Sequence, residues 1–318
     1  MQIGMIGLGR MGANLALRLM RNGHQIVAYD RDAKTAQALA RDGATAAGDL
    51  ADLIARLAAP RAVWVMLPAG EATEATISRL GEILSAGDTV IDGGNTFWRD
   101  DLRRAKALKA RGIHHIDAGT SGGILGRDKG YCLMIGGEPA AVARLAPVFA
   151  ALSPGGGADA PTAPQGWLHA GPNGAGHFVK MVHNGIEYAL MQAYAEGFQI
   201  LQETASDALP ADERFALDTA AIAEVWRHGS IVSSQLLDVI AKALDADTAL
   251  DDFSGVVADT GEGRWTVQTA IERAIPAMAL ATALNARFRS RKQPNYADKL
   301  ISAMRRGFGG HTEPKGKA

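Results

Sequence analysis

Four polar side chains follow one side of an apolar stretch in the middle of the chain, "GHFVKMVHNGIEYALMQAYAEGF" (176–198). They are an amine, an imidazole, an amide and a carboxylate, at Lys180, His183, Asn184 and Glu187. On a helix this i, i+3, i+4, i+7 spacing confines them to an arc of about 100°. Such a row could bind a substrate and move protons. The same spacing also describes the solvated face of an ordinary amphipathic helix, and the row by itself does not decide between the two.

The residues around this row favour burial of the helix. A solvated helix face usually carries several long charged side chains, whereas the neighbours here are apolar, namely Phe178, Val179, Met181, Val182 and Ile186. The pattern therefore predicts a helix packed against another domain or subunit, with the polar row facing a cleft.

A glycine-rich motif at the start of the chain predicts a nucleotide site. The apolar run 3–6 is typical of a strand, and an apolar helical pattern includes Leu15 and Leu19. Between them Gly7 permits a tight turn, Gly9 lets the backbone approach a pyrophosphate, and Gly12 allows close packing of helix and strand. The N–H groups at the start of the helix would then bind the phosphates. The cofactor-binding residues predicted for this turn are Gly7, Leu8, Gly9, Arg10, Met11 and Gly12.

A carboxylate ends the second predicted strand. The segment "QIVAYD" (25–30) finishes at Asp30, where a Rossmann-type fold places the residue that binds the adenosine ribose hydroxyls. Because a carboxylate repels a 2′-phosphate, Asp30 favours NAD over NADP. Arg31 could pair with such a phosphate, stack on the adenine ring, or be a solvated loop charge. NADP therefore stays open as the less favoured cofactor.

Three more strands are predicted at Ala62–Leu67, Thr89–Gly94 and His114–Gly119, with helical segments between them. This alternation is typical of an α/β fold with a doubly wound parallel sheet. Ligands of such sheets lie at the carboxyl ends of the strands. The loops there, 67–70, 92–95 and 117–123, are small, polar and glycine-rich. Each could be a simple turn, but their convergence favours one ligand crevice, and Leu67, Pro68 and Ala69 are candidate cofactor contacts.

The strongest break in composition is "SPGGGADAPTAP" (153–164), which is typical of a flexible loop near a domain boundary. We therefore expect an NAD-binding Rossmann-type domain at 1–164. From 165 to 318 the pattern is helical, and we expect an all-helical domain for substrate binding and oligomerisation.

Bulk composition excludes several classes of protein. The chain has 318 residues, a formal net charge of -1 and 47% hydrophobic residues, so no basic excess indicates nucleic-acid binding. Its single cysteine, Cys132, excludes an internal disulfide, and we expect it to be buried and inert. We expect neither a signal peptide nor a membrane span, and a cytoplasmic location. No metal is expected, because no convincing metal-ligand spacing is found among His24, His114, His115, His169 and His228.

These motifs together resemble the β-hydroxyacid dehydrogenases, and within them the 6-phosphogluconate dehydrogenase (decarboxylating) family, over essentially the whole chain. The broader marks are "GLGRMG", "DAGTSGG" and a GxGxxxK element at Gly174, Gly176 and Lys180. The narrower marks are "KMVHNGIEY" (180–188), "DGGN", "GRWT" (263–266) and "FGGH" (308–311). The length is similar to the short, NAD-linked branch.

One segment departs from the pattern of the long branch. Where long forms carry "KGTGKW", this chain has "TGEGRW" (260–265). The lysine and threonine that contact substrate in long forms correspond to Thr260 and Glu262. Those two roles are therefore not transferred.

The resemblance implies oxidation of 6-phosphogluconate to ribulose 5-phosphate and CO2, with NAD as cofactor. Lys180 would be the base at the C3 hydroxyl and Glu187 the acid that protonates C1, with catalytic Asn184 and with His183 at the C3 oxygen. Ser121, Gly122 and Gly123 would orient the carboxylate, and Asn95 would lie near both nicotinamide and substrate. The implied pathways are the pentose phosphate pathway and gluconate use.

The resemblance also implies a phosphate site and an assembly. The residues implied for the phosphate are Tyr188, Arg287, Arg305 and His311. Arg287 could instead belong to a solvated basic run. Arg305 and His311 could instead belong to a frayed tail. In the family such tail residues complete the partner subunit's site, which implies a homodimer or homotetramer.

Two alternatives remain open from the sequence. One is another β-hydroxyacid dehydrogenase that oxidises a small acid without decarboxylation, for which Glu187 and the "FGGH" tail would have no use. The other is a catalytically silent NAD-binding module, which would not need Lys180, Asn184 and Glu187 together.

Overall fold

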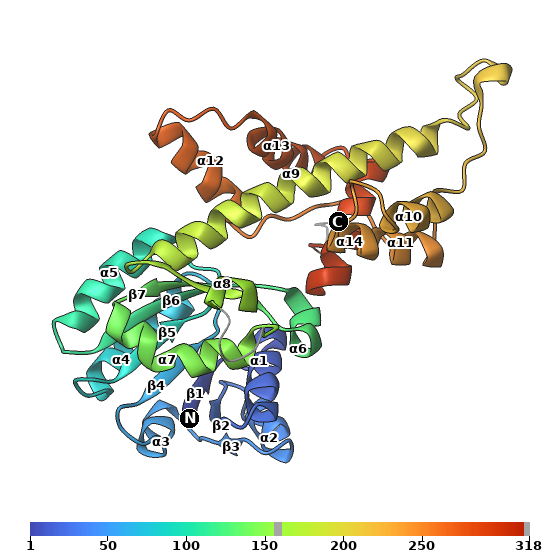
Figure 1. Ribbon diagram of the computed structural model, residues 1–318. Coiled ribbons are helices and arrows are strands. Elements are labelled where there is room, and N and C mark those ends of the chain that lie inside the picture. Colours follow the sequence, from blue (N-terminus) through green and yellow to red (C-terminus); the bar gives the residue numbers. More distant parts are fainter. Residues whose placement is uncertain (156–160, 315–318) are drawn as a thin grey trace. The chain divides into compact units, whose positions relative to one another are not determined.

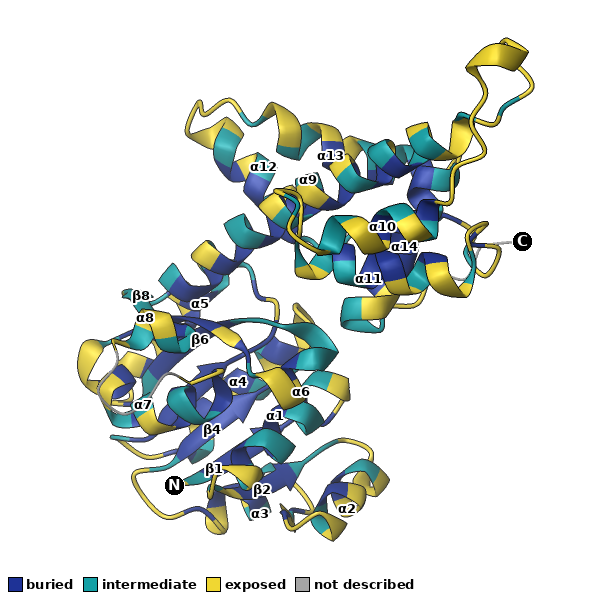
Figure 2. Ribbon diagram, turned by 45° about the vertical axis from the view of Figure 1, so that its right-hand side comes forward, coloured by how far each residue is buried: buried dark blue, intermediate teal, exposed yellow. Residues whose placement is uncertain are grey.

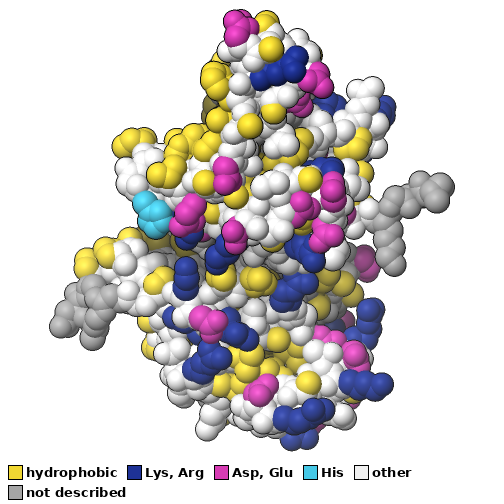
Figure 3. All heavy atoms as spheres, turned by 90° about the vertical axis from the view of Figure 1, so that its right-hand side faces the viewer, with side chains coloured by type: hydrophobic (Ala, Val, Ile, Leu, Met, Phe, Trp, Pro, Cys, Tyr) yellow, Lys and Arg dark blue, Asp and Glu magenta, His cyan; other side chains and the backbone are white. Residues whose placement is uncertain are grey.

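The computed structural model describes residues 1–155 and 161–314, and the chain forms two compact units, Met1–Met181 and Val182–Ala318. Among the helices of these ranges, none combines the length and hydropathy that a membrane-spanning segment needs. Lys and Arg side chains are interspersed with Asp and Glu on the face shown in Figure 3. That mixture agrees with the near-zero net charge.

The first unit contains one eight-stranded sheet with helices on both faces (Figure 1). Its strands are β1 (Gln2–Ile6), β2 (Gln25–Tyr29), β3 (Thr45–Ala46), β4 (Ala62–Val65), β5 (Thr89–Asp92), β6 (His114–Ser121), β7 (Cys132–Gly137) and β8 (Trp167–Gly171). Its helices are α1 (Arg10–Arg21), α2 (Ala33–Arg41), α3 (Leu50–Ala55), α4 (Glu71–Ile83), α5 (Trp98–Lys109), α6 (Gly126–Lys129), α7 (Pro139–Leu152) and α8 (Thr162–Gln165). The order in the sheet is β3-β2-β1-β4-β5-β6-β7-β8.

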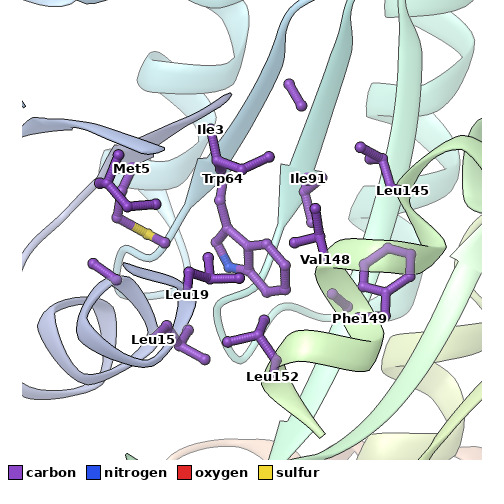
Figure 4. Packing of buried hydrophobic residues seen from close by; sticks show 14 of the residues in the cluster. Ile3, Met5, Leu15, Leu19, Trp64, Ile91, Leu145, Val148, Phe149 and Leu152 are labelled. Carbon is purple, nitrogen blue, oxygen red and sulfur yellow. The ribbon is translucent and has the colours of Figure 1, made fainter. Parts of the chain in front are cut away.

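Alternating side chains of the strands build two separate apolar layers. In β4, Trp64 packs into a layer with α1, α2 and α7, whereas Val63 and Val65 pack into a layer with α3, α4 and α5. This period of two is what a sheet covered on both faces requires. Figure 4 shows Trp64 surrounded by side chains that include Leu19 of α1 and Leu152 of α7. The α/β prediction with a doubly wound sheet is confirmed.

The sheet differs from the prediction at its far edge. β1 to β6 are parallel as predicted, but β7 pairs with β6 antiparallel, since only the short segment 122–131 connects them. Strands β3, β7 and β8 were not predicted. β8 lies beyond residue 164, so the segment from 165 onward is not helical throughout. Of the predicted flexible loop 153–164, residues 156–160 lie outside the described part, and α8 includes 162–164.

The second unit is helical. Its helices are the long α9 (Ala175–Glu203), which begins in the first unit, and α10 (Thr219–Arg227), α11 (Gln235–Ala246), α12 (Glu262–Glu272), α13 (Met278–Ser290) and α14 (Tyr296–Gly309). Its main core joins Phe198 of α9, Ile240 of α11 and Leu300 of α14, all fully buried. Figure 2 shows the buried parts of these helices in dark blue. A smaller cluster joins Tyr188 of α9 to Leu284 of α13. The predicted helix 176–198 is confirmed as part of α9.

Candidate active site

The glycine-rich turn between β1 and α1 is built as a nucleotide site requires. Gly7 has φ +86°, and a Cβ atom there would lie 2.5 Å from the carbonyl oxygen of Met66. A Cβ on Gly12 would lie 1.9 Å from the carbonyl oxygen of Gly7, so helix and strand approach too closely for any side chain. At Gly9, by contrast, a Cβ would meet nothing within 4 Å. Gly9 also caps α1 without a side-chain bond, so this helix start has the open space that a pyrophosphate needs.

Asp30 links this turn to the end of β2. Its carboxylate accepts hydrogen bonds from the backbone N–H of Leu8 at 2.7 Å and of Asp32 at 2.9 Å. The side chain is half-buried, and Arg31 beside it is exposed. The arrangement places a negative charge directly beside the glycine turn, where the ribose of a dinucleotide would lie.

The loops after β4 and β5 pack on each other. A Cβ on Gly94 would lie 2.5 Å from the carbonyl oxygen of Leu67, and Thr73 Oγ1 donates to the carbonyl oxygen of Pro68 at 2.8 Å. Buried Asp92 accepts from the N–H of Gly94 at 3.1 Å and from the hydroxyl of Thr96 at 2.8 Å. Asn95 lies between these two anchors and is exposed. Asp92 therefore holds the loop in a shape that presents Asn95.

Lys180 lies where α9 crosses β6. A Cβ on Gly119 would come within 2.5 Å of the Cβ of Lys180. A Cβ on Gly176 would lie 2.6 Å from the carbonyl oxygen of Asp117. Both glycines are therefore needed for the helix to lie directly on the strand, which buries Lys180 to 7% exposure. The predicted Ser121, Gly122 and Gly123 follow on from the same strand and are partly exposed.

Asp117 and His177, which carried no predicted role, hold the start of α9. Asp117 accepts from the N–H of Gly174 at 2.7 Å and of His177 at 3.0 Å, as a helix-capping side chain does. His177 Nδ1 lies 2.7 Å from Asp101 Oδ2 of α5. For His177, the position one turn before Lys180 was a usable signal, because residues three apart share a helix face.

The side chains of this cluster are buried, and their charges interact. Burial lowers the pKa of His177, but Asp101 and the other nearby carboxylates outweigh it and raise the pKa to about 9. Within the described residues, Asp92, Asp101 and His177 are also close enough to hold a metal ion. Arg104 Nη1, however, already pairs with Asp92 at 2.9 Å, and its charge would repel a cation. The cluster is best explained as an internal ion-pair network.

The remaining polar residues of the row lie on α9 in the second unit. Asn184 is buried, at 8% exposure, whereas His183 and Glu187 are partly exposed. His183 Nδ1 lies 2.9 Å from Asn184 Oδ1 and 3.8 Å from Glu187 Oε2. The amide nitrogen of Asn184 donates to Glu262 at 2.9 Å. An ordinary solvated face does not bury its amide in this way.

Two buried arginines surround Tyr188. The guanidinium of Arg287 lies 3.2 Å from the centre of the Tyr188 ring and donates to the carbonyl oxygen of Ala258. Burial lowers the pKa of Arg287 to about 10, although Tyr188 opposes the shift. Arg305 of α14 is also buried, and the charge of Arg287 and that of Arg305 repel each other. Two buried like charges are costly unless an anion accompanies them.

His311 and Cys132 lie elsewhere. His311 follows the end of α14, and its ring packs against Phe308 with centroids 6.1 Å apart. Cys132 was expected to be buried, but it is exposed at the first position of β7, opposite Ser121 of β6. The expectation was wrong because Cys132 is the first residue of β7, next to the loop 122–131, and does not lie within the apolar layers.

Together, the sheet, the glycine turn and the lysine-bearing helix define a class, the dinucleotide-dependent dehydrogenases with a helical second domain. Residues 2–157 match the NAD binding domain of 6-phosphogluconate dehydrogenase, and residues 176–210 and 193–314 match the C-terminal domain of that enzyme. A Haloferax volcanii protein, NAD(+)-dependent, decarboxylating 6-phosphogluconate dehydrogenase, is 41% identical over 98% of both chains. The chain belongs to the 6-phosphogluconate dehydrogenase family.

Longer relatives share this similarity over part of their length. An NAD(+)-dependent, decarboxylating 6-phosphogluconate dehydrogenase of Bacillus subtilis is 36% identical over 91% of this chain and 61% of its own. The solved structure of Plasmodium falciparum 6-phosphogluconate dehydrogenase, studied with its cofactor NADP+ and its substrate 6-phosphogluconate, superposes with a TM-score of 0.77 at 28% identity. It covers 91% of this chain and 62% of the Plasmodium chain. This chain thus spans less than two thirds of those longer proteins.

Proposed function

We propose that this protein oxidises and decarboxylates 6-phosphogluconate with NAD, forming ribulose 5-phosphate and CO2. The observation that carries this proposal is the full-length similarity to the Haloferax enzyme. Two features support it: Lys180 of α9 is buried, and Asn184 of the same helix is buried in contact with Glu262 of α12. A silent module would have no need to bury them. We place the reaction in the cytoplasm, in pentose phosphate metabolism or gluconate use.

The residues of α9 divide the proton transfers. Burial disfavours the charged form of an amine, which suits Lys180 to take the proton of the C3 hydroxyl. Bound NAD would supply the acceptor for the hydride of C3. The resulting 3-keto acid has its carbonyl β to the carboxylate, so loss of CO2 leaves an enediol. The ammonium of Lys180 stabilises the developing oxyanion, and Glu187, partly exposed two turns further along the same face, protonates C1.

The first unit fits the cofactor on its own residues. The open space at Gly9 and the uncapped start of α1 suit a pyrophosphate. The carboxylate of Asp30 suits ribose hydroxyls and disfavours a 2′-phosphate, which supports NAD, with exposed Arg31 as the residue through which NADP could be used. In functional terms we assign NAD binding to 1–164, and substrate binding and oligomerisation to 165–318.

The second unit fits a phosphorylated substrate. Arg287 and Arg305 are buried, and both interact electrostatically with Tyr188. The positive charge of Arg305 also acts on Arg287. The carboxylates of Glu187 and Asp259 already act on both arginines, and a sugar phosphate would add a further anion, whose geometry an arginine fork matches. His311 would complete the site. Within the first unit, Ser121, Gly122, Gly123 and Asn95 would bind the carboxylate end.

The long helix α9 supports an oligomer. Val179, Ile186, Leu190 and Ile200 are each between 40% and 69% exposed, and their spacing places them within roughly 80° of arc on one face. An exposed apolar stripe of this kind is typical of a subunit interface. We infer a homodimer or homotetramer in which the tail of the partner subunit completes the site. We expect the protein to bind a small phosphorylated sugar acid, and neither nucleic acid nor a membrane.

The test is to incubate the purified protein with 6-phosphogluconate and either NAD or NADP, following cofactor reduction and trapping CO2. Reduction with stoichiometric CO2, faster with NAD, is the expected result. Reduction without CO2 would indicate a hydroxyacid dehydrogenase that does not decarboxylate. No reduction with either cofactor would overturn the proposal.

A further inference from the structure

Glu262 lies at the point where this chain departs from the long-branch pattern. It is the first residue of α12, following Gly261 (φ +107°), and only 2% of its surface is exposed. Oε1 accepts from the amide nitrogen of Asn184 at 2.9 Å, and Oε2 accepts from the hydroxyl of Thr260 at 2.6 Å. Asn184 and Thr260 therefore satisfy one carboxylate oxygen each.

Two further features stabilise a carboxylate here. It lies at the N-terminus of a helix, where the helix dipole favours negative charge. It is also near a buried cation: burial lowers the pKa of Arg305, and Tyr188 and Glu262 oppose that shift. The helix N-terminus and the charge of Arg305 thus favour a carboxylate at this position of the second unit.

The carboxylate fixes the orientation of the Asn184 amide. A carboxylate oxygen accepts hydrogen bonds, so Asn184 must turn its NH2 group toward Glu262. Its carbonyl oxygen then faces the opposite way, where it lies 2.9 Å from Nδ1 of His183. Reversing the amide would place NH2 against the imidazole and oxygen against oxygen at Glu262, which is repulsive.

The amide in turn fixes the imidazole of His183. Because a carbonyl oxygen only accepts, Nδ1 must carry the proton in the 2.9 Å contact. Glu187 Oε2, 3.8 Å from the same nitrogen, favours the same proton position. In the neutral ring Nε2 is then an acceptor.

We propose that Glu262 is a positioning residue that, through Asn184, sets the imidazole tautomer of His183, so that Nε2 can accept a hydrogen bond from a substrate hydroxyl. This inference rests on the proposed function, since it assigns the fixed pair to a hydroxyl-bearing sugar acid. Thr260 and Glu262 then replace direct contacts to substrate by an internal chain from Thr260 to Glu262, Asn184 and His183.

The first arm of the test is kinetic. Glu262→Ala removes both acceptors, and we expect kcat to fall roughly 10- to 100-fold because the reacting hydroxyl is misplaced. KM for NAD should stay within about twofold, since Glu262 belongs to the other unit from the glycine turn. The deuterium isotope effect with C3-deuterated 6-phosphogluconate should rise as hydride transfer becomes rate-limiting.

Matched variants separate positioning from folding. Glu262→Gln should retain most activity, because its carbonyl oxygen can accept from Asn184 while its NH2 donates to Thr260. Glu272→Ala, at the exposed end of the same helix, should be unchanged. If Glu262→Ala does not fold, Glu262→Asp replaces it, because this variant keeps the charge but withdraws the carboxylate from Asn184. Wild-type kcat in the folded variant would overturn the inference.

The second arm needs no turnover. Nitrogen-15 NMR of labelled histidine in the substrate-free protein should show His183 as the Nδ1–H tautomer in the wild type and in Glu262→Gln, and a mixture in Glu262→Ala. An Nε2–H tautomer in the wild type would refute the inference even if the enzyme is active. A fixed Nδ1–H tautomer that depends on Glu262, in a protein that does not oxidise 6-phosphogluconate, would overturn the proposed function alone.

Discussion

At the scale of single residues, Lys180 and Glu187 of α9 differ in their surroundings. Lys180 is buried beneath its glycine contacts, whereas the carboxylate of Glu187 keeps 22% of its side-chain surface exposed. A buried base protected from water suits the first, oxidative proton transfer. A group with access to solvent suits the last one, because it can be reprotonated after each turnover.

Substitution of these two residues should therefore stop the reaction at different steps. Lys180→Met should lower kcat by about 10³-fold or more, with no burst of reduced cofactor. Glu187→Gln should still reduce NAD in a first burst but form ribulose 5-phosphate more slowly. Stopped-flow absorbance and product assay separate the two outcomes. Glu196→Gln, on the exposed part of the same helix, serves as control, and a normal steady-state rate in either of the first two variants would contradict the assignment.

At the scale of elements, the contact of β6 with the start of α9 positions Lys180. Gly119→Ala would force the new methyl group to within 2.5 Å of the Cβ of Lys180. We expect a loss of about 1–3 kcal/mol in unfolding free energy and a fall in kcat larger than that in the affinity for NAD. Denaturant unfolding and initial rates measure both quantities.

Gly197 supplies the control for that substitution. It lies on α9, and a Cβ there would meet nothing within 4 Å. Gly197→Ala should therefore raise the unfolding free energy by up to about 1 kcal/mol through helix propensity, and leave kcat unchanged. If both variants lost kcat equally, a general effect on the helix would explain the result better than the local contact.

An ion-pair link between α4 and α5 should make the first unit sensitive to acid. Arg103 binds Glu74 in two places and Arg104 adds a third bond. The hydrogen bond from Arg103, against an opposing effect of burial, lowers the pKa of Glu74 from 4.5 to about 2. A lowered pKa means that this stabilisation is present above pH 4.5 and is lost as the pH falls toward 2.

Glu74→Gln should thus cost about 1 kcal/mol of unfolding free energy at pH 7, a modest value because the site is one third exposed. The difference from wild type should shrink between pH 4.5 and 2. Urea unfolding across this range measures it. Glu82→Gln, which breaks the exposed Arg79–Glu82 pair on the same helix, should cost less. A constant difference at every pH would contradict the ion-pair explanation.

The elements show why the sequence predicts part of the molecule. β1, β2, β4, β5 and β6 carry apolar runs, and in all but β4 the run is followed by glycine or aspartate, so their pattern is visible locally. β8 carries its one buried side chain at Trp167 and is otherwise partly exposed, so no apolar run marks it. The row on α9 is visible for the same reason, whereas Glu262 is not: its role depends on a contact 78 residues away in the chain, which spacing cannot reveal.

At the scale of the whole molecule, the exposed stripe of α9 and the tail at His311 both favour an assembly of subunits. An exposed apolar stripe is typical of a surface that another subunit covers. His311, which follows α14, can contribute only to a site that lies near the end of α14. If the partner's tail completes each site, one site draws Lys180 and His311 from different subunits. Activity is then a property of the assembly and not of one chain.

Mixing two inactive variants tests this dependence. Lys180→Met lacks the base and His311→Ala lacks the tail imidazole, so each homo-oligomer should be nearly inactive. After the two are unfolded and refolded together, a mixed dimer contains one site with both residues intact. Activity should recover to roughly a quarter of the wild-type value, because half of the dimers are mixed and each has one complete site. Variants refolded separately and then combined provide the control. If the co-refolded sample stays as inactive as that control, each site is built from a single chain, and the stripe on α9 serves an assembly without shared sites.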